Sequence, residues 1–220
     1  MRHARASLVL ALSGRRVLVP ATLLAFAVAG VFAYRPNPVQ GSWAVTAVLS
    51  TVFCAWLVAA VEREVGAGAG AILTVLAGGA ARGWVGRVAL VALLTLVVTL
   101  AFMIWPAASG AFERTPGAGD VGAATLAHLA CGAVGGALAL LLAAPARTAT
   151  AFALIFGGWL ASIGLAGALG PLAGPGGVAA ALSRAPDDTV SAAVVVACAV
   201  TFAQAELLAY GSRRLARWRG

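Results

Sequence analysis

The sequence predicts an all-helical membrane protein that crosses a lipid bilayer six times. Of its 220 residues, 62% are hydrophobic and 10% are charged, whereas about 25% of the residues in a soluble domain are charged. A bilayer accommodates this much apolar surface on helices that hydrogen-bond their own backbone. Six apolar stretches of 18 to 24 residues match the roughly 20 residues that a helix needs to cross.

The first predicted element is a short amphipathic helix within residues 1–16, where four arginines surround an apolar run. Such a helix lies along the membrane surface with its apolar side in lipid. A secretory signal peptide is the competing interpretation. We reject it because the next apolar stretch, residues 17–34, is longer than the usual signal core of about 7–15 residues. Residues 17–34 are therefore the first predicted span.

Polar or turn-forming residues separate the later spans. Residues 35–42 contain two prolines and a glycine, which favour a turn. A longer linker, residues 170–188, has room for one short helix near residues 177–184 and is predicted to be an extended outer segment. The later spans are 43–61, 88–105, 121–144, 148–169 and 189–210, and the whole chain, 1–220, forms one membrane domain.

The distribution of arginine predicts the orientation of these spans. Twelve arginines lie in the two tails, in residues 62–87 and in the turn between the fourth and fifth spans, and three lie in the other connections. Because cytoplasmic loops of membrane proteins are enriched in positive charge, both termini are predicted to be cytoplasmic. The surplus of arginine is thus explained by the membrane, and the sequence shows no basic face with interleaved aromatics for nucleic acid.

Residues 65–81 could form a seventh span, since 17 residues without a charge reach the lower length limit for a membrane-spanning helix. A seventh span would place one arginine-rich tail outside, against the charge bias. Five glycines also lower the helix propensity of this stretch. We therefore interpret it as an interfacial or cytoplasmic helix with its lead-in.

Glu62 and Glu64 follow the second span directly, at the carboxyl end of the predicted helix. The helix dipole disfavours anions at that end by about 0.3–1 kcal/mol, so these carboxylates call for a compensating partner. Two interpretations remain open. The charges either order the connector 62–87 and contact a partner subunit, or form a solvated edge that ends the span.

The connector resembles that of the type-2 ABC transporter permeases (ABC-2). In that family a Glu-Arg-Glu-x-Gly-Thr stretch leads into a leucine-rich coupling helix, and a Pro-x-x-Arg turn opens the third span. This chain departs from the pattern with Ala67 at the threonine position, a small Gly/Ala insertion and Gly79 in place of proline. The matching residues are Glu62, Arg63, Glu64, Gly66, Ile72, Leu73, Leu76, Arg82 and Arg87.

The resemblance implies an exporter subunit that pairs with a second permease chain, identical or similar, and with two ABC ATPase subunits, which hold ATP and Mg²⁺. It implies a location in the bacterial cytoplasmic membrane, and the apolar interior suggests an amphiphilic or hydrophobic cargo. The docking and coupling surface for the ATPase would consist of Glu62, Glu64, Ile72, Leu73, Leu76 and Arg82.

Nothing in the sequence predicts that this chain is itself an enzyme. A P-loop requires a lysine that reaches the phosphates, and the chain contains no lysine. No metal-binding pattern occurs, and Cys54, Cys131 and Cys198 lie singly in three different spans. We therefore expect no cofactor or metal on this chain.

Two ionisable residues are predicted within the membrane, where such groups are costly and often functional. For His128 the alternatives are a hydrogen-bonded packing residue and a ligand-binding residue. For Glu206 they are contact with interfacial water and a place on a polar translocation route. Gly132 and Gly136 form a small-xxx-small pair typical of close helix packing, within one chain or between subunits.

A different class of function also remains open. The chain could be a stand-alone six-span subunit that binds a small molecule, or a membrane anchor for a cytoplasmic complex. Neither of these functions requires a charged connector after the second span. Association with an ATPase separates these functions from a permease.

Overall fold

The computed structural model describes residues 15–33, 36–66, 80–143 and 148–217. The elements in these ranges are α2 (Arg15–Val31), α3 (Val39–Gly66), α5 (Ala80–Ala108), α6 (Ala118–Ala143), α7 (Thr148–Leu169), the 3-10 helix η1 (Gly170–Ala173), α8 (Pro175–Ser183) and α9 (Ala192–Arg217). For these residues the predicted all-helical fold class is confirmed. The predicted surface helix within residues 1–16 lies outside them, apart from the backbone of Arg15 and Arg16 in α2.

The helices have the length and composition expected of a protein that crosses a membrane several times. A shorter apolar helix, Leu18–Val31, comes first. Five further stretches in the described residues are long and apolar enough to cross: Val39–Arg63, Gly83–Ala108, Ala118–Leu142, Ala153–Ala173 and Ala192–Leu215.

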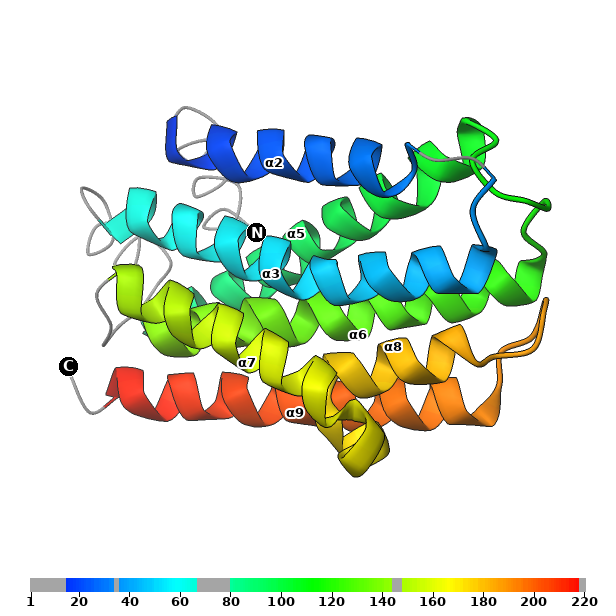
Figure 1. The fold of residues 1–220 in the computed structure, drawn as a ribbon. Helices are drawn as coiled ribbons and strands as arrows, with labels where there is room; N and C mark the ends of the chain where they lie inside the picture. The colour runs from blue at the N-terminus through cyan, green and yellow to red at the C-terminus, as the bar shows by residue number, and fades with distance from the viewer. Residues whose placement is uncertain (1–14, 34–35, 67–79, 144–147, 218–220) are drawn as a thin grey trace.

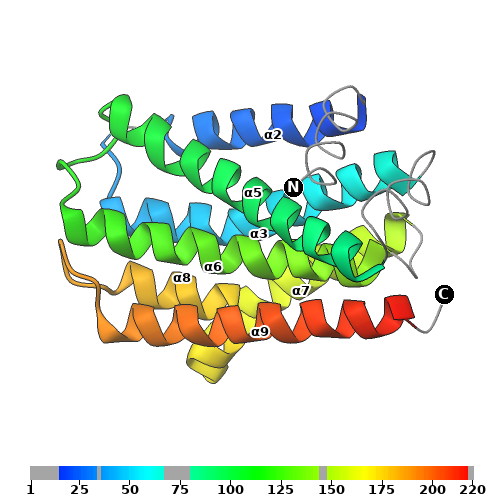
Figure 2. The same ribbon diagram turned by 180° about the vertical axis from the view of Figure 1, so that it is seen from behind.

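The long helices lie side by side and alternate in direction along the chain from α2 to α6 (Figures 1 and 2). At one end, here called the tail end, α2 begins, α3 ends, α5 begins and α9 ends. At the opposite end, here called the far end, α2 leads to α3, α5 to α6, and α8 to α9. The first described helix, α2, therefore begins at the same end of the bundle at which the last, α9, terminates.

Helix α3 forms the centre of the bundle. Inside the protein, 78% of its apolar stretch is buried, against 6% of that of α7. Helix α6 packs closely on α3 and also packs against α9. Trp43, Val58 and Phe102 are among the largest fully buried side chains of this core.

Two helices extend beyond the spans predicted for them. The second span was predicted to end at residue 61, but α3 continues through Glu62 to Gly66. The third span was predicted to begin at residue 88, but α5 begins at Ala80. Helical hydrogen bonds continue past the point where charged residues end a hydropathic stretch, so both ends of the predicted connector are helical.

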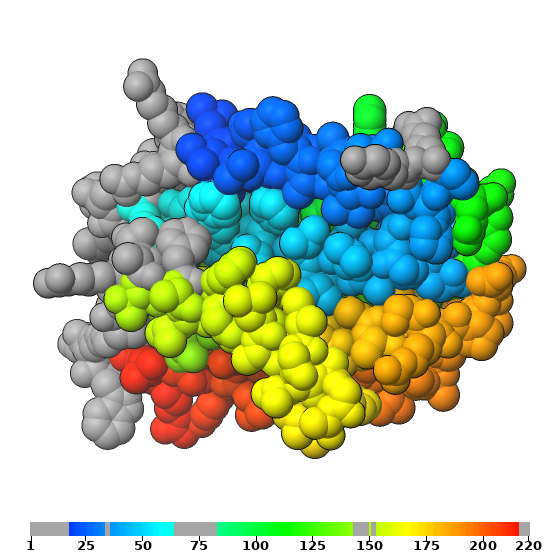
Figure 3. Space-filling model, viewed as in Figure 1, coloured from blue at the N-terminus to red at the C-terminus, as the bar shows by residue number. Residues whose placement is uncertain are grey.

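In residues 170–188, predicted to be an extended outer linker with room for one short helix, the structure has η1 and α8. A short helix does form where one was expected, but α8 lies against α3, α7 and α9, with Val178 and Leu182 fully buried. A Cβ atom on Gly176 would overlap the carbonyl oxygen of Ser162 in α7, so glycine permits this approach. Figure 3 shows the carboxyl end of α7 projecting from the body of the bundle.

Candidate functional site

An ion pair joins α3 to α5 at the tail end of the bundle. Arg87 Nε lies 3.4 Å from Glu62 Oε2. The Glu62 side chain is 12% exposed and that of Arg87 is 40% exposed, so the carboxylate faces the protein more than solvent. The two residues lie on the helices that flank the predicted coupling segment.

This pair explains how an acidic residue is tolerated at the carboxyl end of α3. Glu62 lies in the last turns of the helix, where the exposed carbonyl groups repel an anion. Arg87 supplies the opposite charge from the neighbouring helix. The compensating partner predicted for Glu62 is therefore present, and it belongs to the same chain.

The other predicted coupling residues are only partly described. Glu64 lies on α3 and Arg82 on α5, but their side chains fall outside the described part of the structure. Ile72, Leu73 and Leu76 lie outside it altogether. The described geometry therefore consists of a clamp between Glu62 and Arg87, which links the adjoining ends of α3 and α5.

Breaking this clamp should loosen the tail end. We expect Arg87→Ala to lower the free energy of unfolding by about 1 kcal/mol, because it leaves a poorly exposed carboxylate without its partner. Glu62→Gln combined with Arg87→Ala should cost less than the two single changes added together. Thermal melting of the four proteins in one detergent checks this, and strict additivity would show that the two side chains do not interact.

His128 lies between α6 and α3 with both ring nitrogens in hydrogen bonds. Nδ1 lies 2.7 Å from the Ala124 carbonyl oxygen, and Nε2 lies 2.9 Å from Thr46 Oγ1. The residue is 0% exposed, and its ring lies 5.8 Å from that of Phe102. With both nitrogens occupied and no exposed surface, His128 has the geometry of a packing residue.

The predicted glycine pair lies where α6 meets its neighbours. A Cβ on Gly132 would lie 2.7 Å from Thr95 Cγ2, and a Cβ on Gly136 would overlap the side chain of Val91, also on α5. Sequence reasoning missed Gly135, where a Cβ would overlap the backbone carbonyl of Thr51 in α3. Gly135 therefore marks the tightest approach between the two central helices.

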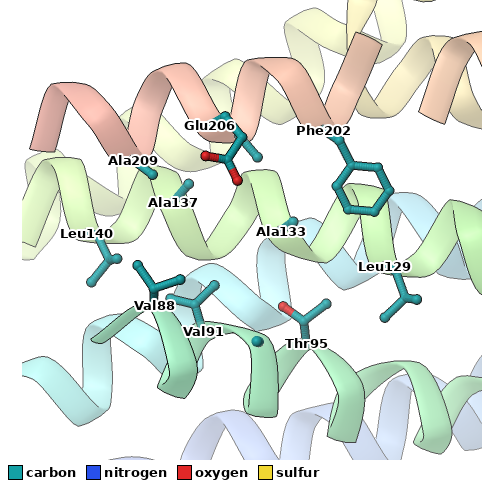
Figure 4. Close-up of a pocket in the computed structure, with 12 residues that line it drawn as sticks. Val88, Val91, Thr95, Leu129, Ala133, Ala137, Leu140, Phe202, Glu206 and Ala209 are labelled. Atoms are coloured by element: carbon teal, nitrogen blue, oxygen red, sulfur yellow. The ribbon is translucent and has the colours of Figure 1, made fainter. Parts of the chain in front are cut away.

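Glu206 lies on α9, apart from His128, at an open-sided cavity between α5, α6 and α9 (Figure 4). No group of three or more His, Cys, Asp or Glu side chains among the described residues is arranged to hold a metal ion. The three cysteines are free and buried.

Sequence reasoning also missed a far-end polar cluster, which joins four segments through one carboxylate. Asp120, in the first turn of α6, accepts hydrogen bonds from both terminal nitrogens of Arg114, at 2.5 and 3.0 Å, and from Gln40 Nε2 at 2.9 Å. The backbone N–H groups of Gly117 and Asp188 also donate to it, each at 2.9 Å. The hydrogen bond to Asp120 raises the pKa of Arg114, which keeps the guanidinium charged.

Asp187 completes the far-end polar cluster from the loop that precedes α9. Its Oδ1 accepts from Gln40 at 2.7 Å and from Arg114 at 2.9 Å, but its side chain is 73% exposed. The next residue, Asp188, has a positive φ of 51° and accepts from the Gly119 N–H at 2.8 Å. The cluster thus holds the connections at the far end in one arrangement.

Comparison of the chain with protein-family models, curated proteins and solved structures finds no match.

Proposed function

We propose that this chain is the transmembrane permease subunit of an ABC-2-like exporter in a bacterial cytoplasmic membrane. In this proposal the chain crosses six times, with α2 as the first span, and its tail end faces the cytoplasm. Two ABC ATPase subunits bind at the tail end, hold ATP and Mg²⁺, and supply the energy. A second permease chain completes the transporter, and the cargo is amphiphilic or hydrophobic.

The observation that supports this proposal most is the clamp between Glu62 and Arg87. It joins the two helices on either side of the segment that resembles an ABC-2 coupling connector. Force applied to that segment would act on the adjoining ends of α3 and α5 as a pair. Because α3 is the most buried of the candidate spans, a displacement of its end reaches the helices packed around it.

The arrangement of charge supports the same orientation. The tail end adjoins the arginine-rich tails and the connector, which hold most of the arginines of the chain. Positive charge beside the spans favours the cytoplasmic side. An ATP-driven motor needs that side, since ATP is supplied there.

Association with an ATPase tests the proposal directly. The tagged chain, expressed in its native host and extracted in mild detergent, should retain a vanadate-sensitive, Mg²⁺-dependent ATPase. We expect Arg82→Glu to lower the retained activity about tenfold, since reversing a charge at an interface costs on the order of 1.4 kcal/mol or more. The matched control is Arg184→Glu, the same change beyond α8 and near the far end, which should leave the retained activity unchanged.

Two outcomes would contradict the proposal. If no ATPase is retained while the chain is well expressed, the chain is a stand-alone binding subunit or an anchor. If Arg184→Glu removes the ATPase as fully as Arg82→Glu, the motor does not dock at the tail end.

A further inference from the structure

An open-sided cavity of about 300 Å³ lies between α5, α6 and α9. Val88 and Val91 from α5, Leu140 from α6 and Phe202 from α9 line it (Figure 4). All the other lining residues are apolar as well, except Thr95 and Glu206. The cavity is therefore an apolar groove that contains one charged residue.

Glu206 projects from α9 into this groove (Figure 4). It lies within the apolar stretch Ala192–Leu215 and seven residues before Arg213, a distance of about 10 Å along a helix. A carboxylate at this depth costs a few kcal/mol unless a partner neutralises it. The charge is therefore expensive to keep and calls for an explanation.

No side chain in the described part of the protein supplies that partner. The carboxylate of Glu206 forms no ion pair and no hydrogen bond there, and Arg214, one of the two nearest arginines along α9, instead contacts Tyr210. The contrast with Glu62 is direct, since Glu62 has Arg87 at 3.4 Å. The groove therefore presents an unpaired negative charge beside a long apolar wall.

We propose that this groove binds an amphiphilic cation, with the cationic centre beside Glu206 and the apolar body along Val91 and Phe202. Charge complementarity selects a cation over a neutral lipid chain, because a cation offsets the cost of the carboxylate and a neutral chain does not. Phe202 lies one helical turn from Glu206 on α9, where an aromatic face also attracts a cation. The proposal concerns binding alone, so it does not depend on the ATPase partnership.

Binding of rhodamine 6G, a permanent lipophilic cation, tests this proposal. The purified full chain is placed in phosphatidylcholine nanodiscs, and fluorescence polarisation is measured against empty nanodiscs. We expect saturable binding that Glu206→Gln weakens about tenfold, the effect of losing one interaction with a charged group. Glu113→Gln makes the same chemical change in the loop between α5 and α6 and should bind like the unmodified chain.

A second probe and a second variant separate charge from shape. Nile red is neutral and apolar, and its binding should be unaffected by Glu206→Gln. Ala133→Leu adds volume to the groove and should weaken both probes. If rhodamine 6G binds Glu206→Gln as tightly as the unmodified chain, or if Glu206→Gln weakens both probes equally, the groove is an unselective apolar surface and the proposal fails. Matching elution profiles and melting temperatures establish that each variant is folded.

Discussion

Gly135→Ala is expected to destabilise the bundle more than alanine at Gly132 or Gly136, the other α6 glycines that face a neighbouring long helix. The new methyl group would overlap the carbonyl oxygen of Thr51, which belongs to the backbone of the most buried span, α3. A backbone carbonyl in a helix cannot rotate away, so α3 and α6 must separate. Overpacking of this kind costs about 1–3 kcal/mol, and we expect a lower melting temperature of the detergent-solubilised chain.

The other glycines supply graded controls for this prediction. Gly132 and Gly136 face side chains of α5, which can shift, so alanine there should cost less than at Gly135. Gly164 on α7 has nothing within 4 Å of an added Cβ, and alanine there should be neutral or stabilising because it favours the helix. Equal melting temperatures for Gly135→Ala and Gly164→Ala would show that α3 and α6 are not packed this closely.

The positions of the long helices could be predicted from hydropathy, because lipid and protein core both select apolar side chains. The ends of these helices could not be predicted from hydropathy. Glu62 and Arg87 mark the limits of two apolar stretches in the sequence, yet both lie within helices. Their pairing across α3 and α5 lowers the cost of each charge, and no pattern local to either residue reveals it. The sequence likewise did not reveal that α3 is largely buried inside the protein and α7 is not.

Residues 170–188 show a second limit of the sequence. Their glycines and prolines were interpreted as a linker, since both residue types favour turns. In the structure the same glycines permit close contact, because Gly176 and Gly177 face backbone atoms of α7 and η1. A glycine can form a turn or permit a close contact between helices. Which of these it does depends on the segment that packs against it, and the local sequence does not show that segment.

The candidate sites were predicted to different degrees. Glu62 and Glu206 were identified because charged residues in or beside apolar spans are costly. Their different surroundings, an ion pair for Glu62 and an unpaired groove for Glu206, emerge only when the helices pack. Asp120 was missed, because its partners come from positions as distant as Gln40 and Asp188.

Asp120→Asn should disrupt the far-end polar cluster. The side chain is 1% exposed, and it accepts hydrogen bonds from five donor atoms of four residues, Gln40 included. An amide in its place would turn an N–H donor toward other donors. Lost hydrogen bonds to a buried charged group cost about 2–3 kcal/mol. Asp187→Asn is the matched control: its side chain is 73% exposed, and we expect a loss below about 1 kcal/mol.

Trypsin cleavage after Arg184 reports the loss of stability caused by Asp120→Asn. It also reports on which side of the membrane the far end lies. Arg184 is exposed and directly follows α8, close in sequence to the Asp187 and Asp188 members of the far-end polar cluster. Asp120→Asn should therefore speed cleavage there, while Asp187→Asn changes it little. Because trypsin does not cross a bilayer, the proposed orientation requires cleavage in right-side-out vesicles and protection in inverted ones. Cleavage only in inverted vesicles would place the far end in the cytoplasm and reverse the assignment of the two tails.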